Sequence, residues 1–260
     1  MNNIIIKNAA QVVTCSGFEG KRGAEMSNLH VIENGTVIVT DGIISHVLKK
    51  GEAIPIDVSG YKEIDATGKA LLPGFVDPHT HFVFGGHREE EFSWRMRGDS
   101  YMSIMERGGG IVNTTKATRE ASEEELYNSA KRRLDDMLEL GITTVEGKSG
   151  YGLDKDTEMK QLRVMRKLNE DHPMDIVSTF MGPHATPAEW KGREDEFIDF
   201  NINEMLPLVA KEKLAECADI FCEENVFTIE QSRRFLTAAR EHGFLLKLHA
   251  DEIVQFGGAE

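Results

Sequence analysis

Two histidines stand at alternate positions directly after an apolar run that covers residues 71–76. They are His79 and His81. Side chains at i and i+2 of an extended segment point to the same side, so the two imidazoles face one point in space. Imidazole nitrogen is a common ligand of zinc and similar metals. The spacing therefore predicts a mononuclear metal site, and it disfavours the alternative of two unconnected surface histidines in a loop.

A third histidine follows another apolar run, residues 245–248, and a glutamate comes three positions later. These are His249 and Glu252. A lone histidine is weak evidence of a ligand, but the nearby carboxylate strengthens it. A metal lowers the pKa of bound water from ~15.7 toward ~7, and a neighbouring carboxylate can take the proton and pass it to a leaving nitrogen. The pattern predicts hydrolysis, with His249 as the third ligand and Glu252 as the catalytic acid and base.

From about residue 67 onward, short apolar runs alternate with longer amphipathic stretches. The runs cover residues 71–76, 142–145, 176–181, 220–222 and 245–248. Capping-box spacing at Ser122 and Glu125 predicts a helix to Leu140, and the same spacing at Thr228 and Gln231 predicts one that ends near residue 242. We expect further helices over residues 156–169 and around 203–214. Strands alternating with helices predict parallel βαβ units.

The position of the polar side chains indicates which parallel architecture these units form. Nearly every predicted strand ends in residues that could act in catalysis: His79, His81, Glu146, Lys148, His184, Glu223, Glu224, His249 and Glu252. A barrel gathers the C-terminal ends of all its strands around one site, whereas an open sheet uses mainly its switch point. We therefore predict an α/β fold, a (β/α)8 TIM barrel with about five of its eight units present.

The first 66 residues have a different texture. They contain short β-branched runs at residues 4–6, 11–15, 36–40 and 43–47. Asn34-Gly35 and Asp41-Gly42 separate some of these runs and are typical of tight hairpin turns. We predict that residues 1–66 form the N-terminal part of a small β-sandwich domain and that residues 67–260 form the barrel.

Composition sets broader limits on function. The chain has 260 residues, a formal charge of −14, 40% apolar residues and a mean hydropathy of −0.35, which is typical of a globular protein. The acidic balance argues against nucleic acid, which needs clustered lysine and arginine. Three cysteines, Cys15, Cys217 and Cys222, are expected to be free thiols. With no signal peptide or membrane span recognised, we expect a cytoplasmic protein.

Longer motifs carry a family resemblance. Residues 73–81, together with His249-x-x-Glu252, resemble the amidohydrolase superfamily. The segments at residues 84–92, 108–111, 146–153 and 180–185 are similar to the imidazolonepropionase family of histidine degradation. The resemblance extends over essentially the whole chain, and it is the combination of motifs that makes it specific.

The resemblance implies a metal-dependent opening of 4-imidazolone-5-propanoate to N-formimidoyl-L-glutamate. It implies one zinc or iron ion per subunit, held by His79, His81 and His249, with Glu252 acting on water and substrate. The residues that match substrate-contacting positions of the family are Arg88, Tyr151, His184 and Glu252. A planar guanidinium suits the substrate carboxylate. Tyr101 is a further candidate, Lys148 has no assigned role, and a homodimer is left open.

The chain departs from the family pattern at its end. The family's fourth ligand, an Asp after the eighth strand, and a further catalytic His have no counterpart before Glu260. We therefore expect the isolated chain to be inactive or poorly soluble. Two alternative functions share the histidine motifs: an amidohydrolase-type deaminase of a purine-like or pyrimidine-like ring, and an inactive metal-binding fragment.

Overall fold

The computed structural model describes residues 3–17, 19–99, 103 and 109–260. The chain divides into two compact units, Met1–Gly74 and Phe75–Glu260. Each unit is built around its own sheet, and each is described separately below. The division lies later than residue 66 because Ala66 packs into the core of the first unit and residues 70–71 pair with its first strand.

The first unit is one mixed sheet. Its strands are β1 (Ile4–Val13), β2 (Val31–Thr40), β3 (Ile43–Leu48), β4 (Lys62–Asp65) and β5 (Ala70–Leu71). They lie in the order β3-β2-β1-β4, and β5 also pairs with β1. A 3-10 helix covers Gly23–Ser27. The layer that would complete a sandwich stays a prediction.

Local details of this sheet correct two expectations. The runs at residues 4–6 and 11–15 join into the single strand β1, which has an irregular register between Ile6 and Ala9. Asp41-Gly42 forms the predicted β2–β3 turn, with φ of 52° and 82°. Asn34-Gly35 lies inside β2 instead, where a Cβ on Gly35 would come within 2.8 Å of Val12. Glycine there permits close packing between strands rather than a turn.

The second unit contains a parallel sheet that forms part of a (β/α)8 barrel. Its strands are β6 (Phe75–Thr80), β7 (Ile142–Lys148), β8 (Asp175–Phe180), β9 (Cys217–Ala218) and β11 (Leu245–Leu246), in the order β11-β9-β8-β7-β6. The short strand β10 (Phe221–Cys222) follows β9 in the chain, and β12 (His249–Ala250) follows β11. These two strands form a second parallel pair. The first barrel strand was expected at residues 71–76, but β6 begins at Phe75. The reason is that β5 belongs to the first unit and Pro73-Gly74 separates it from β6.

Helices follow the strands as predicted. They are α1 (Glu89–Met96), α3 (Ile111–Glu120), α4 (Glu123–Glu139), α5 (Lys155–Asp171), α6 (Glu194–Phe200), α7 (Leu206–Glu212) and α8 (Ile229–Glu241), with a short 3-10 helix at Ala188–Trp190. Capping boxes at Ser122 and Thr228 are both confirmed. The helix expected around 203–214 begins earlier, because α6 continues through a π-helical turn, Asn201–Met205, into α7.

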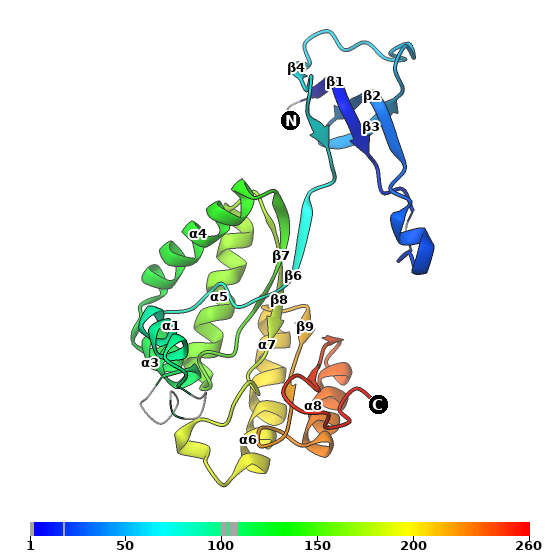
Figure 1. Ribbon diagram of the computed structural model, residues 1–260. Coiled ribbons are helices and arrows are strands. Elements are labelled where there is room, and N and C mark those ends of the chain that lie inside the picture. The colour runs from blue at the N-terminus through cyan, green and yellow to red at the C-terminus, as the bar shows by residue number, and fades with distance from the viewer. Residues whose placement is uncertain (1–2, 18, 100–102, 104–108) are drawn as a thin grey trace. The chain divides into compact units, whose positions relative to one another are not determined.

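The core of the second unit lies between the sheet and its helices. Figure 1 shows α4 and α5 alongside β7 and β8. Val145 and Ile176 of the strands are buried together with Leu134 of α4 and Leu162 of α5. This packing fixes the strands in register, so their C-terminal ends meet at one edge of the sheet. Within the ranges that the structure describes, no helix is long and apolar enough to cross a membrane.

Candidate metal and substrate site

Two histidines from distant parts of the sequence meet at the C-terminal edge of the sheet. His79 lies near the end of β6, and His249 begins β12. Their Nε2 atoms are 2.7 Å apart, and their ring centroids are 4.8 Å apart. The two rings therefore converge on one point. Their nitrogens are in direct contact, closer together than the roughly 3.3 Å that separates two nitrogen ligands of one tetrahedral zinc ion.

A second group of rings lies beside this pair. His81 stacks on His184, with centroids 4.7 Å apart and planes inclined by 10°. The ring of Tyr151 lies against both, with its centroid 4.9 Å from that of His81 and 5.4 Å from that of His184. The sequence motifs singled out all three residues, and the structure brings them together.

The two histidines of this second group favour their neutral form. Burial lowers the pKa of His81 well below its ordinary value, and the neighbouring histidines and Lys148 lower it further. Burial also lowers the pKa of His184 to about 4, although its contact with the Gly150 carbonyl opposes the shift. Neutral imidazoles keep a nitrogen lone pair for a metal or for a substrate N–H.

A buried ionic network lies against His249. Lys148 Nζ lies 2.6 Å from Glu146 Oε1 and 2.7 Å from Asp219 Oδ2, and all three side chains are almost fully buried. Asp219 Oδ2 is also 3.0 Å from His249 Nδ1, in a bent contact that leaves the N–H without an aligned acceptor. Lys247 Nζ adds a 2.7 Å contact to Glu146. Burial would raise the pKa of Asp219, but His249 and Lys148 outweigh it and lower the pKa.

The network explains what Lys148 does. A buried cation between two carboxylates compensates their desolvation. A carboxylate on Nδ1 of a histidine fixes the tautomer in which Nε2 is free to bind a metal. Asp219 thus occupies the position of an outer partner to His249, the predicted metal ligand.

The loop that carries Tyr151 is fastened to the first turn of α5. Glu158 accepts hydrogen bonds from the backbone N–H groups of Gly152 at 2.8 Å and Leu153 at 2.9 Å, and from Gly150 at 3.1 Å. The carbonyl of Gly150 in turn accepts a 2.9 Å hydrogen bond from His184 Nδ1.

The loop that carries Glu252 is fastened in a similar way. Glu223, which is 1% exposed, accepts backbone N–H groups of Glu252 at 2.9 Å and Ile253 at 2.8 Å. The side chain of Glu252 itself is exposed. The structure therefore fixes the backbone of this residue beside His249 without burying its carboxylate.

Within the described part of the chain, no contact joins Arg88 to the histidines. Arg88 is the N-cap residue of α1, and its Nε lies 3.7 Å from Glu91 Oε2. Tyr101 lies outside the described residues. Their expected contacts with substrate stay predictions.

The donor set fits a metal in part. His79 and His249 converge, and His81 offers a buried Nδ1 without a hydrogen-bond partner. The ring of His81 is 6.1 Å from that of His79, farther than two ligands of one tetrahedral ion would be. Among the residues that can be described, no three His, Cys, Asp or Glu side chains close around a single point. The geometry thus brings His79 and His249 together beside the carboxylate of Asp219, and the metal-ligand roles of His79, His81 and His249 stay predictions.

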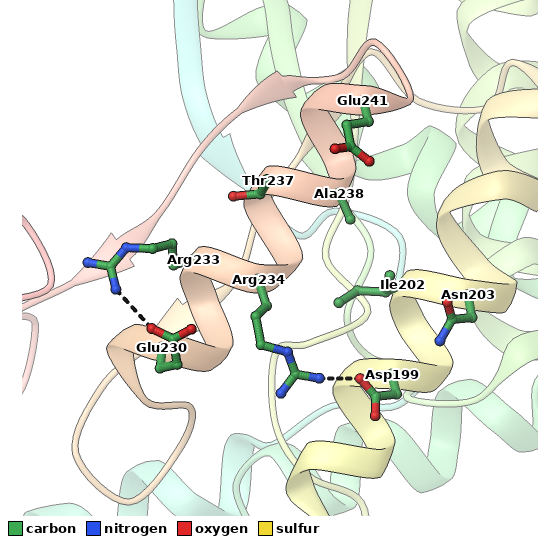
Figure 2. Close-up of a pocket in the computed structure, with 9 residues that line it drawn as sticks. All are labelled: Asp199, Ile202, Asn203, Glu230, Arg233, Arg234, Thr237, Ala238 and Glu241. Atoms are coloured by element: carbon green, nitrogen blue, oxygen red, sulfur yellow. Dashed lines mark hydrogen bonds and ion pairs between the residues drawn. The ribbon is translucent and has the colours of Figure 1, made fainter.

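A surface hollow elsewhere in the barrel unit has a different character. Figure 2 shows it between α8 and the helical segment at residues 199–203. Its two arginines are paired across or along the helices: Arg234 with Asp199 and Asp195, and Arg233 with Glu230. These cations are already compensated, so the hollow offers little to an ionic ligand.

Two known proteins are similar to this chain over almost all of its length. The imidazolonepropionase of Clostridium tetani (strain Massachusetts / E88) is 61% identical over 259 residues, which cover 99% of this chain and 62% of that protein. The imidazolonepropionase of Parabacteroides distasonis is 60% identical over 260 residues, with 100% and 62% coverage. The chain is similar to imidazolonepropionases over essentially all of its length. It spans about 62% of the length of these curated relatives. No protein-family model matches it.

Solved structures support the fold assignment. The 5-methylcytosine deaminase of Klebsiella pneumoniae with phosphonocytosine is similar at a TM-score of 0.64 and 18% identity, over 96% of this chain and 52% of that one. An atrazine chlorohydrolase of Arthrobacter aurescens TC1, complexed with zinc and atraton, is similar at a TM-score of 0.58 and 17% identity, over 98% and 55%. These structural likenesses and the parallel sheet confirm the expected partial (β/α)8 barrel.

Sequence reasoning missed two residues that position others in this site. Asp219 directly follows β9 and stands between two buried apolar residues, Ala218 and Ile220. A charged residue within such an apolar run is a sequence signal that could have identified it. Glu158 carries no comparable signal, because a glutamate in the first turn of a helix is ordinary.

Proposed function

We propose that the protein of this chain hydrolyses 4-imidazolone-5-propanoate to N-formimidoyl-L-glutamate. The observation that carries the proposal is the convergence of His79 and His249 at Nε2, in a chain about 60% identical to curated imidazolonepropionases. The sequence similarity indicates which reaction is catalysed. The geometry supports a site at the C-terminal edge of the barrel strands, where barrel enzymes carry their active sites.

The metal ligands in this proposal are His79, His81 and His249, with zinc as the favoured ion and iron as the alternative. Nitrogen donors suit zinc, and a solved structure of the same fold contains it. When bound, such an ion supplies a water nucleophile at neutral pH. Asp219 lies 3.0 Å from Nδ1 of His249, and in this proposal its charge favours the tautomer that leaves Nε2 of this ring available.

The remaining residues bind substrate and move protons. Glu252 takes a proton at its carboxylate and returns it to the leaving ring nitrogen. His184, with Nδ1 donating to Gly150, accepts a ring N–H at Nε2. Tyr151 contacts the ring of the substrate, and Arg88 pairs with the propionate carboxylate once released from Glu91. A cytoplasmic location and a homodimer belong to the same proposal.

The test supplies the part of the family's length that the chain does not span. A chimera joins residues 1–260 to the remaining C-terminal segment of the Clostridium tetani relative, and ring opening is followed by the loss of substrate absorbance. We expect turnover and about one bound metal per chain. His79→Ala should abolish both, whereas His30→Ala, a change to an exposed histidine outside the cluster, should leave both unchanged.

Two results would contradict the proposal. Ammonia release from a pyrimidine or purine ring without imidazolone opening would indicate the deaminase reading. Metal bound at about one equivalent without any turnover by the chimera would indicate a metal-binding protein without this activity.

A further inference from the structure

Glu158 is a buried carboxylate with an unusual set of partners. It is the fourth residue of α5 and is 2% exposed. Its described partners are the backbone N–H groups of Gly150, Gly152 and Leu153, together with the hydroxyl of Ser149. All of these groups donate, which is the pattern that a carboxylate requires. No lysine or arginine in the described ranges forms an ion pair with it.

Its hydrogen bonds hold a loop in a conformation that most residues avoid. Gly150 has φ of +106° and Leu153 has φ of 56°. A Cβ on Gly152 would lie 2.6 Å from the backbone nitrogen of Glu158. The loop is therefore pressed against the start of α5. The carboxylate of Glu158 satisfies the amides of Gly150, Gly152 and Leu153, and Gln161 Oε1 accepts the N–H of Tyr151 at 3.3 Å.

The loop connects Glu158 to two residues of the site. Gly150 donates its N–H to Glu158 and accepts His184 Nδ1 at its carbonyl, 2.9 Å away. Tyr151, the next residue, lies against the rings of His81 and His184. A shift of the loop would move the tyrosine and release the histidine together.

We propose that Glu158 is a positioning residue that fixes the tautomer of His184 and the place of Tyr151 through the loop at residues 149–153. The inference rests on the proposed function, in which these two side chains contact substrate. Because a carbonyl oxygen can only accept, His184 carries its hydrogen on Nδ1 and presents Nε2 as an acceptor. The site thereby prefers a ligand with a ring N–H at this point over one with a carbonyl.

Burying this carboxylate is costly, and a packing role alone would not require it. An apolar side chain of similar volume would fill the space without desolvating a charge. The amides of the loop need an acceptor only because the loop is held in this conformation. The loop conformation, rather than the core of α5, is what Glu158 serves.

The first test uses the purified chain without metal or substrate. Imidazole ¹⁵N NMR reports the tautomer of His184, and amide hydrogen exchange reports Gly150, Gly152 and Leu153. In Glu158→Gln we expect a mixture of His184 tautomers and exchange at the loop amides at least about tenfold faster, because one acceptor oxygen is lost. Leu168→Ala is the matched control. It truncates a fully buried residue near the other end of α5 and should lower thermal stability without changing the tautomer or favouring exchange at the loop.

A second test uses the chimera with its metal. Glu158→Gln should raise KM for imidazolonepropionate about tenfold or more, with a smaller change in kcat, while Leu168→Ala should leave KM unchanged. Unaltered tautomer and loop exchange in Glu158→Gln would overturn the positioning role even in an active enzyme. An inactive chimera in which the tautomer still responds would overturn the proposed function and leave the positioning role standing.

Discussion

The loop that carries Tyr151 and the loop that carries Glu252 are both fastened to a buried glutamate by backbone N–H groups. Glu158 holds the first and Glu223 the second. The surroundings differ. Gly150, Gly152 and Leu153 are buried, whereas residues 252–255 are exposed. The same hydrogen-bonding arrangement therefore lies within the protein in one case and beneath a thin surface layer in the other.

The pKa values of the two carboxylates shift in opposite directions for this reason. Burial raises the pKa of Glu158, and the hydrogen bonds from Ser149 and the loop amides oppose this only in part. For Glu223, the backbone N–H groups, above all that of Ile253, lower the pKa and outweigh the effect of burial. Each carboxylate has four donors, since Glu223 also accepts the N–H groups of Glu224 and Val254. Equal numbers of donors do not give equal stabilisation, because the cost of desolvation decides the balance.

The largest expected difference between the loops follows from removing the acceptors. Glu158→Leu leaves three backbone amides buried without partners, at a cost of about 1–3 kcal/mol each, so we expect a loss of about 3–9 kcal/mol in the free energy of unfolding. Glu223→Leu frees amides that water can reach, and its loss should be clearly smaller. Denaturant unfolding of the purified chain measures both. Equal losses would show that the exposure of the loop does not matter.

The glycines of the two loops provide the next comparison. Gly150 and Gly257 both have positive φ, at +106° and +84°. A Cβ on Gly150 would lie 2.8 Å from the Met181 carbonyl oxygen and 2.9 Å from His184, whereas a Cβ on Gly257 meets nothing within 4 Å. Gly150→Ala should cost about 2–4 kcal/mol, and Gly257→Ala about 1–2 kcal/mol from backbone strain alone.

Thermal unfolding measures both glycine substitutions. Imidazole NMR of His184 adds a check, because only Gly150→Ala should disturb the ring. A Gly257→Ala variant as unstable as Gly150→Ala would mean that the loop at residues 251–257 is packed more tightly than the structure shows.

These loops also show where the sequence was informative. Alternation of apolar runs and capped helices predicted the barrel, and alternate spacing placed His79 and His81 near the end of its first strand. Partners such as Asp219 and Glu158 could not be predicted, because they depend on contacts between residues far apart in the chain or on backbone amides that any residue can supply. Tyr151 and His184 were found by motif, and Arg88 shows that a motif does not by itself give a contact.

The smallest and sharpest difference is expected in the pH dependence of stability. Glu158 has its folded pKa raised above the ordinary 4.5, so its contribution is fully present below 4.5 and is lost as pH rises through the folded value. Glu158→Gln lacks this loss, and its stability relative to the parent chain should rise with pH above 4.5, by at most about 1.4 kcal/mol per pH unit.

Glu223 should behave in the opposite way. Its folded pKa is lowered, so its contribution is present above the ordinary 4.5 and is lost as pH falls through the folded value. Glu223→Gln should therefore lose stability relative to the parent chain as pH rises toward 4.5 from below, and the difference should stay constant above it. Unfolding free energies from about pH 3 to about pH 7 for the three proteins test both signs. If the two differences change with pH in the same direction, desolvation is not what separates the loops, and the hydrogen bonds alone would set both titrations.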